Sequence, residues 1–188
     1  MIGSFLKVLL AVVFIRLLPI VTGDIQWRLS GGAGNADPNA SLGGVISATA
    51  IVDATNDNLF DDVSGAESSA GDIEYRGFYV RNNHGTLTLQ GSVIYISSLT
   101  SSADTEFDLA VAAEAMNVTM ATIANESTAP ATVSFTRPTT FAGGLQLNGA
   151  TGLTAGSNRG VWIRRTVNAS AAAAADAGTL KVEGDTAP

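Results

Sequence analysis

Apolar side chains at every second position constrain this chain more than any other feature of its sequence. In residues 106–111, Phe107, Leu109 and Val111 alternate with other residues. Successive side chains of a β-strand point to opposite faces, so this spacing predicts a strand with one buried face. The alternation recurs in four further pairs: Leu87 and Leu89, Val133 and Phe135, Leu145 and Leu147, and Leu180 and Val182.

The clearest local pattern lies in the middle of the chain. Residues 74–81 (EYRGFYVR) and 86–90 (TLTLQ) flank the sequence NNHG at 82–85, and residues 92–98 (SVIYISS) follow directly. Asn and Gly tolerate the positive φ angles of tight turns, so we expect a hairpin between the first two segments. Residues 92–98 are apolar on both faces, which predicts a central strand or one that meets another subunit.

Two β-branched runs predict further strands. The first is residues 45–53 (VISATAIVD), where Ile46 and Val52 would lie on a core face, and the second is residues 160–167 (GVWIRRTV). Residues 31–44 and 53–72, which separate the strands, are rich in Gly, Asn, Asp and Ser and are expected to be surface loops.

One bulky pair, Leu59 and Phe60, interrupts the polar loop at 53–72 and should hold it to the core. An alanine-rich stretch at 169–177 is too short for a stable isolated helix.

We therefore predict an all-β fold: a single antiparallel β-sandwich over residues 24–188, Ig-like or jelly-roll-like, with seven to nine strands. A chain of 188 residues is long enough for one such domain with its own core.

Residues 1–23 differ from the rest, because they are apolar except for Lys7 and Arg16. We exclude this hydrophobic segment from the domain. Three interpretations stay open: a secretory signal peptide cleaved after Gly23, a membrane anchor or subunit-facing helix, and a working protein that starts near Asp24. Arg16 disfavours the anchor, because a central arginine costs about 2.5–3.5 kcal/mol on insertion scales.

The distribution of charge and the lack of cysteine exclude one class of partner and two sources of stability. The formal net charge is −7, and the ten basic residues are scattered apart from the neighbouring Arg164 and Arg165. Nucleic-acid binding requires a concentrated basic face, so we expect no nucleic-acid partner. Cysteine is absent, so disulfides and thiolate metal sites contribute nothing, and stability depends on burial, backbone pairing or neighbouring subunits.

Catalytic patterns are missing as well. His84 is the only histidine and falls in the predicted turn, which excludes any mechanism that needs two imidazoles. The glycine-rich residues 31–44 lack the spacing of a phosphate-binding loop. Glu67, Asp72 and Glu74 are close in sequence, as a pair of hydrolytic carboxylates would be, but no aromatic sugar groove accompanies them. We predict a protein that is not an enzyme and uses no cofactor.

One acidic stretch resembles a calcium-binding loop only in part. Asp53, Asp57, Asp61 and Asp62 offer the carboxylate oxygens that Ca²⁺ prefers. The EF-hand pattern, however, requires glycine where Asn58 stands and a bidentate glutamate where Ser64 stands. These four residues are therefore candidate metal ligands, and we favour a solvated loop.

Three residues are candidates for contact with another protein subunit. Trp162 and Arg164 share one face of a predicted strand, and tryptophan and arginine are enriched in interface hot spots. Tyr95 lies in the segment that is apolar on both faces. The alternative for Trp162 is that it completes the core with an arginine stacked on it.

Four segments of the chain together resemble a known group of proteins. They are GGAGNADPNASLGG at 31–44, NLFDD through GSVIYIS at 58–97, TAGSNRGVWIRRTV at 154–167 and the terminal LKVEGDT. In order and content, above all in EYRGFYVRN and GVWIRRTV, they resemble small structural proteins of tailed bacteriophages. The resemblance implies a β-sandwich virion component on the head or in the tail.

From this resemblance we expect a bacteriophage capsid decoration protein, or else a tail or neck component. Its partners would be other virion proteins, such as major capsid or tail subunits, and further copies of itself. The alternative is a secreted or periplasmic bacterial adhesin or binding module, which the apolar segment 1–23 favours. Membrane contact is expected only if that segment is retained.

Overall fold

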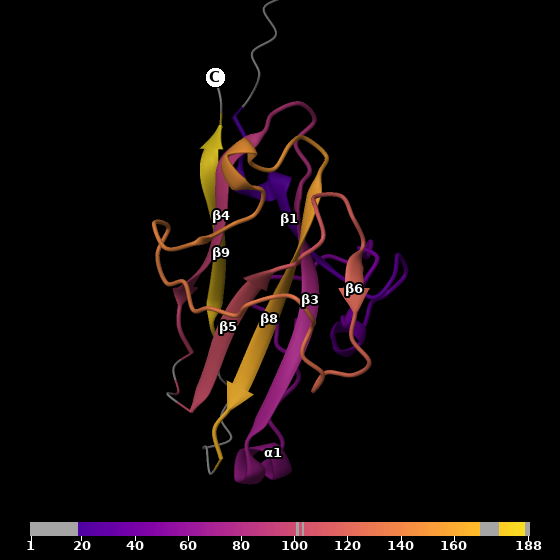
Figure 1. Ribbon diagram of the computed structural model, residues 1–188, viewed down its shortest axis with the longest axis vertical. Helices are drawn as coiled ribbons and strands as arrows, with labels where there is room; N and C mark the ends of the chain where they lie inside the picture. The colour runs from indigo at the N-terminus through magenta and orange to yellow at the C-terminus, as the bar shows by residue number, and fades with distance from the viewer. Residues whose placement is uncertain (1–18, 101, 103, 170–176, 187–188) are drawn as a thin grey trace, which may run out of the picture.

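The computed structural model describes residues 19–100, 102, 104–169 and 177–186. Strands dominate this part of the chain, and the one α-helix in it is short (Figure 1). None of the described helices is long and apolar enough to cross a membrane. The elements in chain order are η1 (Thr22–Asp24), β1 (Ile25–Leu29), η2 (Pro38–Ala40), β2 (Gly43–Gly44), α1 (Gly65–Ala70), β3 (Asp72–Asn82), β4 (Leu89–Ser98), β5 (Thr105–Val111), β6 (Met120–Thr122), β7 (Leu145–Gln146), η3 (Gly149–Thr151), β8 (Asn158–Val167) and β9 (Thr179–Thr186).

Two antiparallel sheets enclose the main core. The larger has the strand order β1-β3-β8-β5 and the smaller the order β7-β4-β9. Phe78 from β3, Ile94 from β4 and Leu109 from β5 meet in this core and are each 0 % exposed. The predicted all-β sandwich is confirmed, and the nine described strands agree with the expected seven to nine.

A short third sheet, β2-β6, covers the outer face of the larger sheet (Figure 1). Tyr79, Met120 and Trp162 form a second apolar cluster beneath it. The layers are so close that a Cβ at Gly43, where φ is +84°, would lie 2.0 Å from the Ala121 carbonyl oxygen. Only glycine fits there, because the positive φ and the contact both exclude a side chain.

Most of the predicted strands are present. Residues 74–81 lie in β3, 106–111 in β5, 160–167 in β8, and Leu180 and Val182 in β9. Residues 92–98 lie in β4, the central strand of the smaller sheet, as their two apolar faces predict. Leu59 is 7 % exposed and holds the loop at 53–72 to the main core as expected.

The predicted hairpin around residues 82–85 is wrong. β3 belongs to the larger sheet and β4 to the smaller one, so the connection crosses between sheets. The Asn82 side chain donates hydrogen bonds to the carbonyl oxygens of Leu87 and Leu153, both at 2.9 Å, and thereby opens the turn. β3 instead pairs with β8 over ten residue pairs. A hairpin with residues 86–90 would form fewer pairs.

Residues 45–53 do not form the predicted core strand. They run beside β1, where Ser47 N donates to Leu29 O at 2.8 Å and Ile51 N donates to Trp27 O at 2.9 Å. The pairing reduces to a single bridge, and Val52 is 61 % exposed because this segment lies at the rim of the sheet.

Two of the shorter strands were also predicted too long. The expected strand around Val133 and Phe135 is reduced to one bridge between Thr136 and Leu109. The strand expected around Leu145 and Leu147 is the two-residue β7.

The first described strand begins close to the apolar N-terminal segment. β1 begins at Ile25, one residue after the expected domain start at Asp24. Ile20 nevertheless packs against the main core, although it belongs to the segment excluded from the domain on sequence grounds. The proposed signal, anchor or untranslated leader falls largely in residues 1–18, outside the described residues, as does most of the alanine-rich link.

Candidate functional site

The main concentration of buried charge lies inside the sandwich, at the end nearest α1. We define the ionic cluster as Asp61, Glu74, Arg76, Glu126 and Arg165. Strand alternation places Glu74 and Arg76 on the same inner face of β3 as Phe78 and Val80. The ionic cluster therefore replaces apolar core at this end of the molecule.

Glu74 and Arg165 form the centre of the ionic cluster. They are 2 % and 5 % exposed, and Arg165 Nε donates to Glu74 Oε2 at 2.5 Å. A second guanidinium nitrogen of Arg165 also contacts this carboxylate. Burial raises the pKa of the Glu74 carboxyl, and the positive charges of Arg165 and Arg76 offset part of the rise. The pair links β3 to β8 where the two strands are in register.

Arg76 extends the ionic cluster toward the surface. Its side chain is fully buried, and its Nη2 donates to Glu126 Oε2 at 2.6 Å and to Asn39 Oδ1 at 3.0 Å. The ring of Phe60 lies 5.4 Å from the Arg76 guanidinium and 4.9 Å from that of Arg165. An aromatic face attracts such cations, so Phe60 stabilises both guanidiniums while Asp61 and Glu126 stay accessible at the surface.

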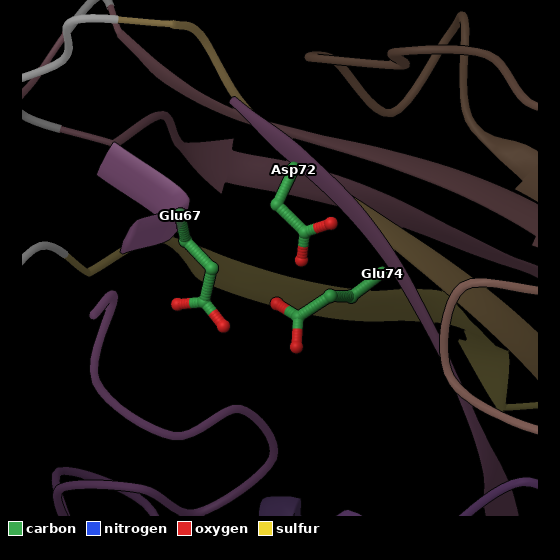
Figure 2. A group of neighbouring side chains, drawn as sticks. All are labelled: Glu67, Asp72 and Glu74. Atoms are coloured by element: carbon green, nitrogen blue, oxygen red, sulfur yellow. The ribbon is translucent and has the colours of Figure 1, made fainter. Parts of the chain in front are cut away.

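Three carboxylates approach one another beside the ionic cluster. Glu67 from α1 and Asp72 and Glu74 from β3 point toward a common space (Figure 2). One oxygen from each lies within 4.8 Å of the others. These are the same acidic residues that are neighbours in the sequence.

Two of these three carboxylates already have structural partners. Ser64 N donates to Glu67 Oε2 at 2.6 Å, and Glu67 N donates to Ser64 Oγ at 3.3 Å, which is a capping box at the start of α1. Glu74 is paired with Arg165. A cation here would compete with a buried guanidinium, so the geometry favours a structural role over metal binding or hydrolysis.

The four candidate calcium ligands do not gather. Asp53, Asp57, Asp61 and Asp62 are all exposed. Asp53 accepts a hydrogen bond from Ala54 N at 2.8 Å, and Asp61 lies 3.5 Å from the Arg165 guanidinium. Within the described part of the chain, the acidic group compact enough for an ion is the one of Glu67, Asp72 and Glu74, not these aspartates.

The three candidate interface residues occupy different environments. Trp162 is 1 % exposed in the second apolar cluster, which agrees with the burial of the core alternative, although the Arg164 guanidinium lies over Phe135 and not over Trp162. Arg164 is one-third exposed, pairs with Asp108 at 2.6 Å and stacks over Phe135. Tyr95 donates to Glu183 Oε2 at 2.5 Å on the outer face of the smaller sheet. Contact of Arg164 and Tyr95 with another subunit stays a prediction.

A second group of ion pairs lies on the outer face of β5. Arg137 contacts Glu106 at 2.6 Å and Asp108 at 3.1 Å, and Asp108 also binds Arg164. The hydrogen bond from Arg137 lowers the pKa of Glu106. Glu106 is therefore unsuited to general acid catalysis, because its carboxylate is held in the charged form.

His84 serves the connection between β3 and β4. Its Nδ1 accepts hydrogen bonds from Thr86 N at 3.2 Å and from Leu87 N at 3.0 Å. The depressions near Asp72 and near Glu106 contain no histidine.

Comparison with known proteins yields no relative. No protein-family model matches the chain, and no curated protein and no solved structure matches it.

The ionic cluster was not predicted from the sequence. Neither Glu74 nor Arg76 was expected in the interior. The signal was present in the alternation of residues 74–81, which puts Glu74, Arg76 and Phe78 on one face. Opposite charges two residues apart on a strand face that continues as apolar core indicate an internal ion pair.

Proposed function

We propose that this protein is a non-enzymatic structural component of a bacteriophage virion, a capsid decoration protein that contacts other capsid subunits. One observation carries the proposal. The two segments in which the resemblance to phage structural proteins is strongest, EYRGFYVRN and GVWIRRTV, are β3 and β8, paired in register at the centre of the larger sheet. Those residues therefore build the scaffold, as expected for a resemblance between structural proteins.

The pairing of the buried charged residues also supports a structural role. The buried Glu74 and Arg165 bind each other, the buried Arg76 binds the partly exposed Glu126, and the ring of Phe60 lies against both guanidiniums. Such a network holds the loop at 53–72 and residue Glu126 against the sandwich, and so shapes surfaces that neighbouring subunits can recognise. A tail or neck component would use the same features and is the nearest variant of the proposal.

A secreted or periplasmic adhesin or binding module is the second candidate, favoured by the apolar residues 1–23. Cleavage after Gly23 would remove Ile20, which packs against the main core. The secreted form would therefore lose a core contact that the full chain keeps.

Quantitative mass spectrometry of density-gradient-purified phage particles tests the proposal. We expect peptides of this protein at a constant ratio to the major capsid subunit in every particle fraction. Separated heads and tails then distinguish decoration from a tail or neck position. Absence from particles, together with a secreted form whose intact mass lacks residues 1–23, would refute the proposal in favour of the binding module.

A further inference from the structure

Most of the strand edges that bound the two sheets are protected by this chain. Residues 47–51 hydrogen-bond to the edge of β1. On β5, Leu109 and Thr136 exchange two backbone hydrogen bonds, of 2.8 and 3.0 Å. The smaller sheet ends on one side in β7, which is only two residues long. Covered or very short edges resist pairing with other chains.

The edge of β9 is the exception. β9 is eight residues long and pairs with β4 on one side only. Among residues 19–100, 102, 104–169 and 177–186, none forms a backbone hydrogen bond with its other side. A strand edge of this length is a template for the addition of another strand.

The pairing within the smaller sheet identifies the free backbone groups. Ile96 N donates to Pro138 O, away from β9, so the alternate residue Tyr95 directs its backbone groups toward β9. Tyr95 lies opposite Lys181. Leu180 and Val182 consequently present their N–H and C=O groups outward. Their side chains are partly buried against the main core, so an added strand would extend that core.

We propose that β9 pairs with β9 of a second copy of this chain, antiparallel, with Val182 on the two-fold axis. Val182 then lies opposite the partner's Val182 as a hydrogen-bonded pair, as the outward direction of its backbone groups requires. The smaller sheets of the two copies join into one continuous sheet. Such an interface uses the same surface on both subunits.

Charge complementarity selects this register. With Val182 on the axis, Lys181 of each copy faces Glu183 of the other, in the pair geometry where side chains approach most closely. A shift to either neighbouring symmetric register sets Lys181 opposite Lys181 or Glu183 opposite Glu183. Both shifts place like charges together, so only the proposed register satisfies both residues.

A lysine on a free edge also discourages non-specific pairing. Lys181 already contacts Glu183 of its own strand at 2.7 Å, and both side chains are substantially exposed. In the dimer, Lys181 and Glu183 of the two copies alternate in the sign of their charge. Lys181 therefore disfavours pairing with unrelated strands but favours pairing with β9 of a second copy. Pairing through β9 is a property of the free chain and does not depend on whether the protein is part of a virion.

Disulfide cross-linking tests the register, because the chain contains no cysteine. Full-length Lys181→Cys and Glu183→Cys variants are oxidised separately and as a mixture. The facing pair has a Cα separation of about 4.5 Å, within the range of a disulfide. We expect the covalent dimer chiefly in the mixture. A Val118→Cys variant, exposed in the loop before β6, measures random collision.

The other outcomes overturn the proposal. A dimer from Lys181→Cys alone or Glu183→Cys alone indicates a shifted register. A yield in the mixture no higher than that of Val118→Cys excludes pairing through β9. Detection of the protein in virions is a separate measurement, so failure of this inference and failure of the proposed function are distinguishable.

Charge reversal gives an independent test by sedimentation velocity on the full chain. Lys181→Glu sets acids opposite acids twice in the dimer, and we expect its Kd to rise about tenfold. The double variant Lys181→Glu/Glu183→Lys restores opposite charges across the axis and should recover the original Kd. Failure of the double variant to recover, while its thermal melt equals that of the original protein, would contradict the proposed register.

Discussion

The inner face of β3 contains two kinds of protein interior. Phe78 and Val80 pack in the main core, whereas Glu74 and Arg76 lie in the ionic cluster, and all four are at most 2 % exposed. Apolar burial is favourable with any well-packed neighbour. Buried charge is tolerated only where partners are placed accurately, because desolvation of an ion is costly. One strand face therefore depends on general packing at one end and on specific geometry at the other.

The largest expected effect tests the apolar end. Leu109→Asp places a charge without a partner where the native side chain is 0 % exposed, and we expect loss of folding because the penalty is at least several kcal/mol. Soluble yield and circular dichroism measure the outcome. Val118→Asp, at a residue that is 49 % exposed, is the control and should retain the wild-type melt.

The next effect tests the ionic end. Glu74→Leu leaves Arg165 buried without its main partner and should lower the free energy of unfolding by about 3–5 kcal/mol. The double variant Glu74→Leu/Arg165→Met removes both charges and should recover most of this loss. Urea unfolding measures all three proteins.

A matched substitution on the same face sharpens the comparison between the two ends. Phe78→Leu changes an apolar side chain for another and should cost only about 1–2 kcal/mol. If Glu74→Leu/Arg165→Met is no more stable than Glu74→Leu, the loss of stability comes from the lost geometry of the ionic cluster and not from the unpaired charge of Arg165.

A smaller effect is expected at the aromatic cover of the ionic cluster. Phe60→Leu keeps apolar contact but removes the ring face near Arg76 and Arg165, at a cost of about 1–2 kcal/mol. Thermal unfolding measures the change. In the Glu74→Leu/Arg165→Met background one of the two cations is gone, and the same substitution should cost less. An equal cost in both backgrounds would assign the effect of Phe60 to packing alone.

The smallest effect is in the dependence of stability on pH. Burial raises the folded-state pKa of Glu74 above its unfolded value, so this group binds its proton more tightly in the folded protein. Its contribution is fully present below the unfolded pKa and is lost as pH rises through the folded pKa. Wild type should therefore gain stability relative to Glu74→Gln as the pH falls, by about 1.4 kcal/mol per pKa unit. Parallel stability curves for the two proteins would contradict this.

The sequence predicted the positions of the strands better than it predicted which strands pair. The alternation of Phe107, Leu109 and Val111 and the apolar faces of residues 92–98 correctly predicted β5 and the central strand β4. The turn at 82–85 has the residues of a hairpin, yet Asn82 and His84 use their side chains to build a wider connection. Local turn chemistry is compatible with both arrangements, so the sequence pattern did not distinguish them.

By itself the sequence determined most of the long extended segments and the buried faces of β5 and β9, because apolar alternation repeats within a few residues along the chain. Only the tertiary structure decided how strands pair and how buried charges are satisfied. Arg76 reaches Glu126 across 50 positions of sequence, and Arg165 reaches Glu74 across 91. Such partners meet because the pairing of β3 with β8 and the packing of loops bring distant segments together, and strand periodicity contains no information about that distance.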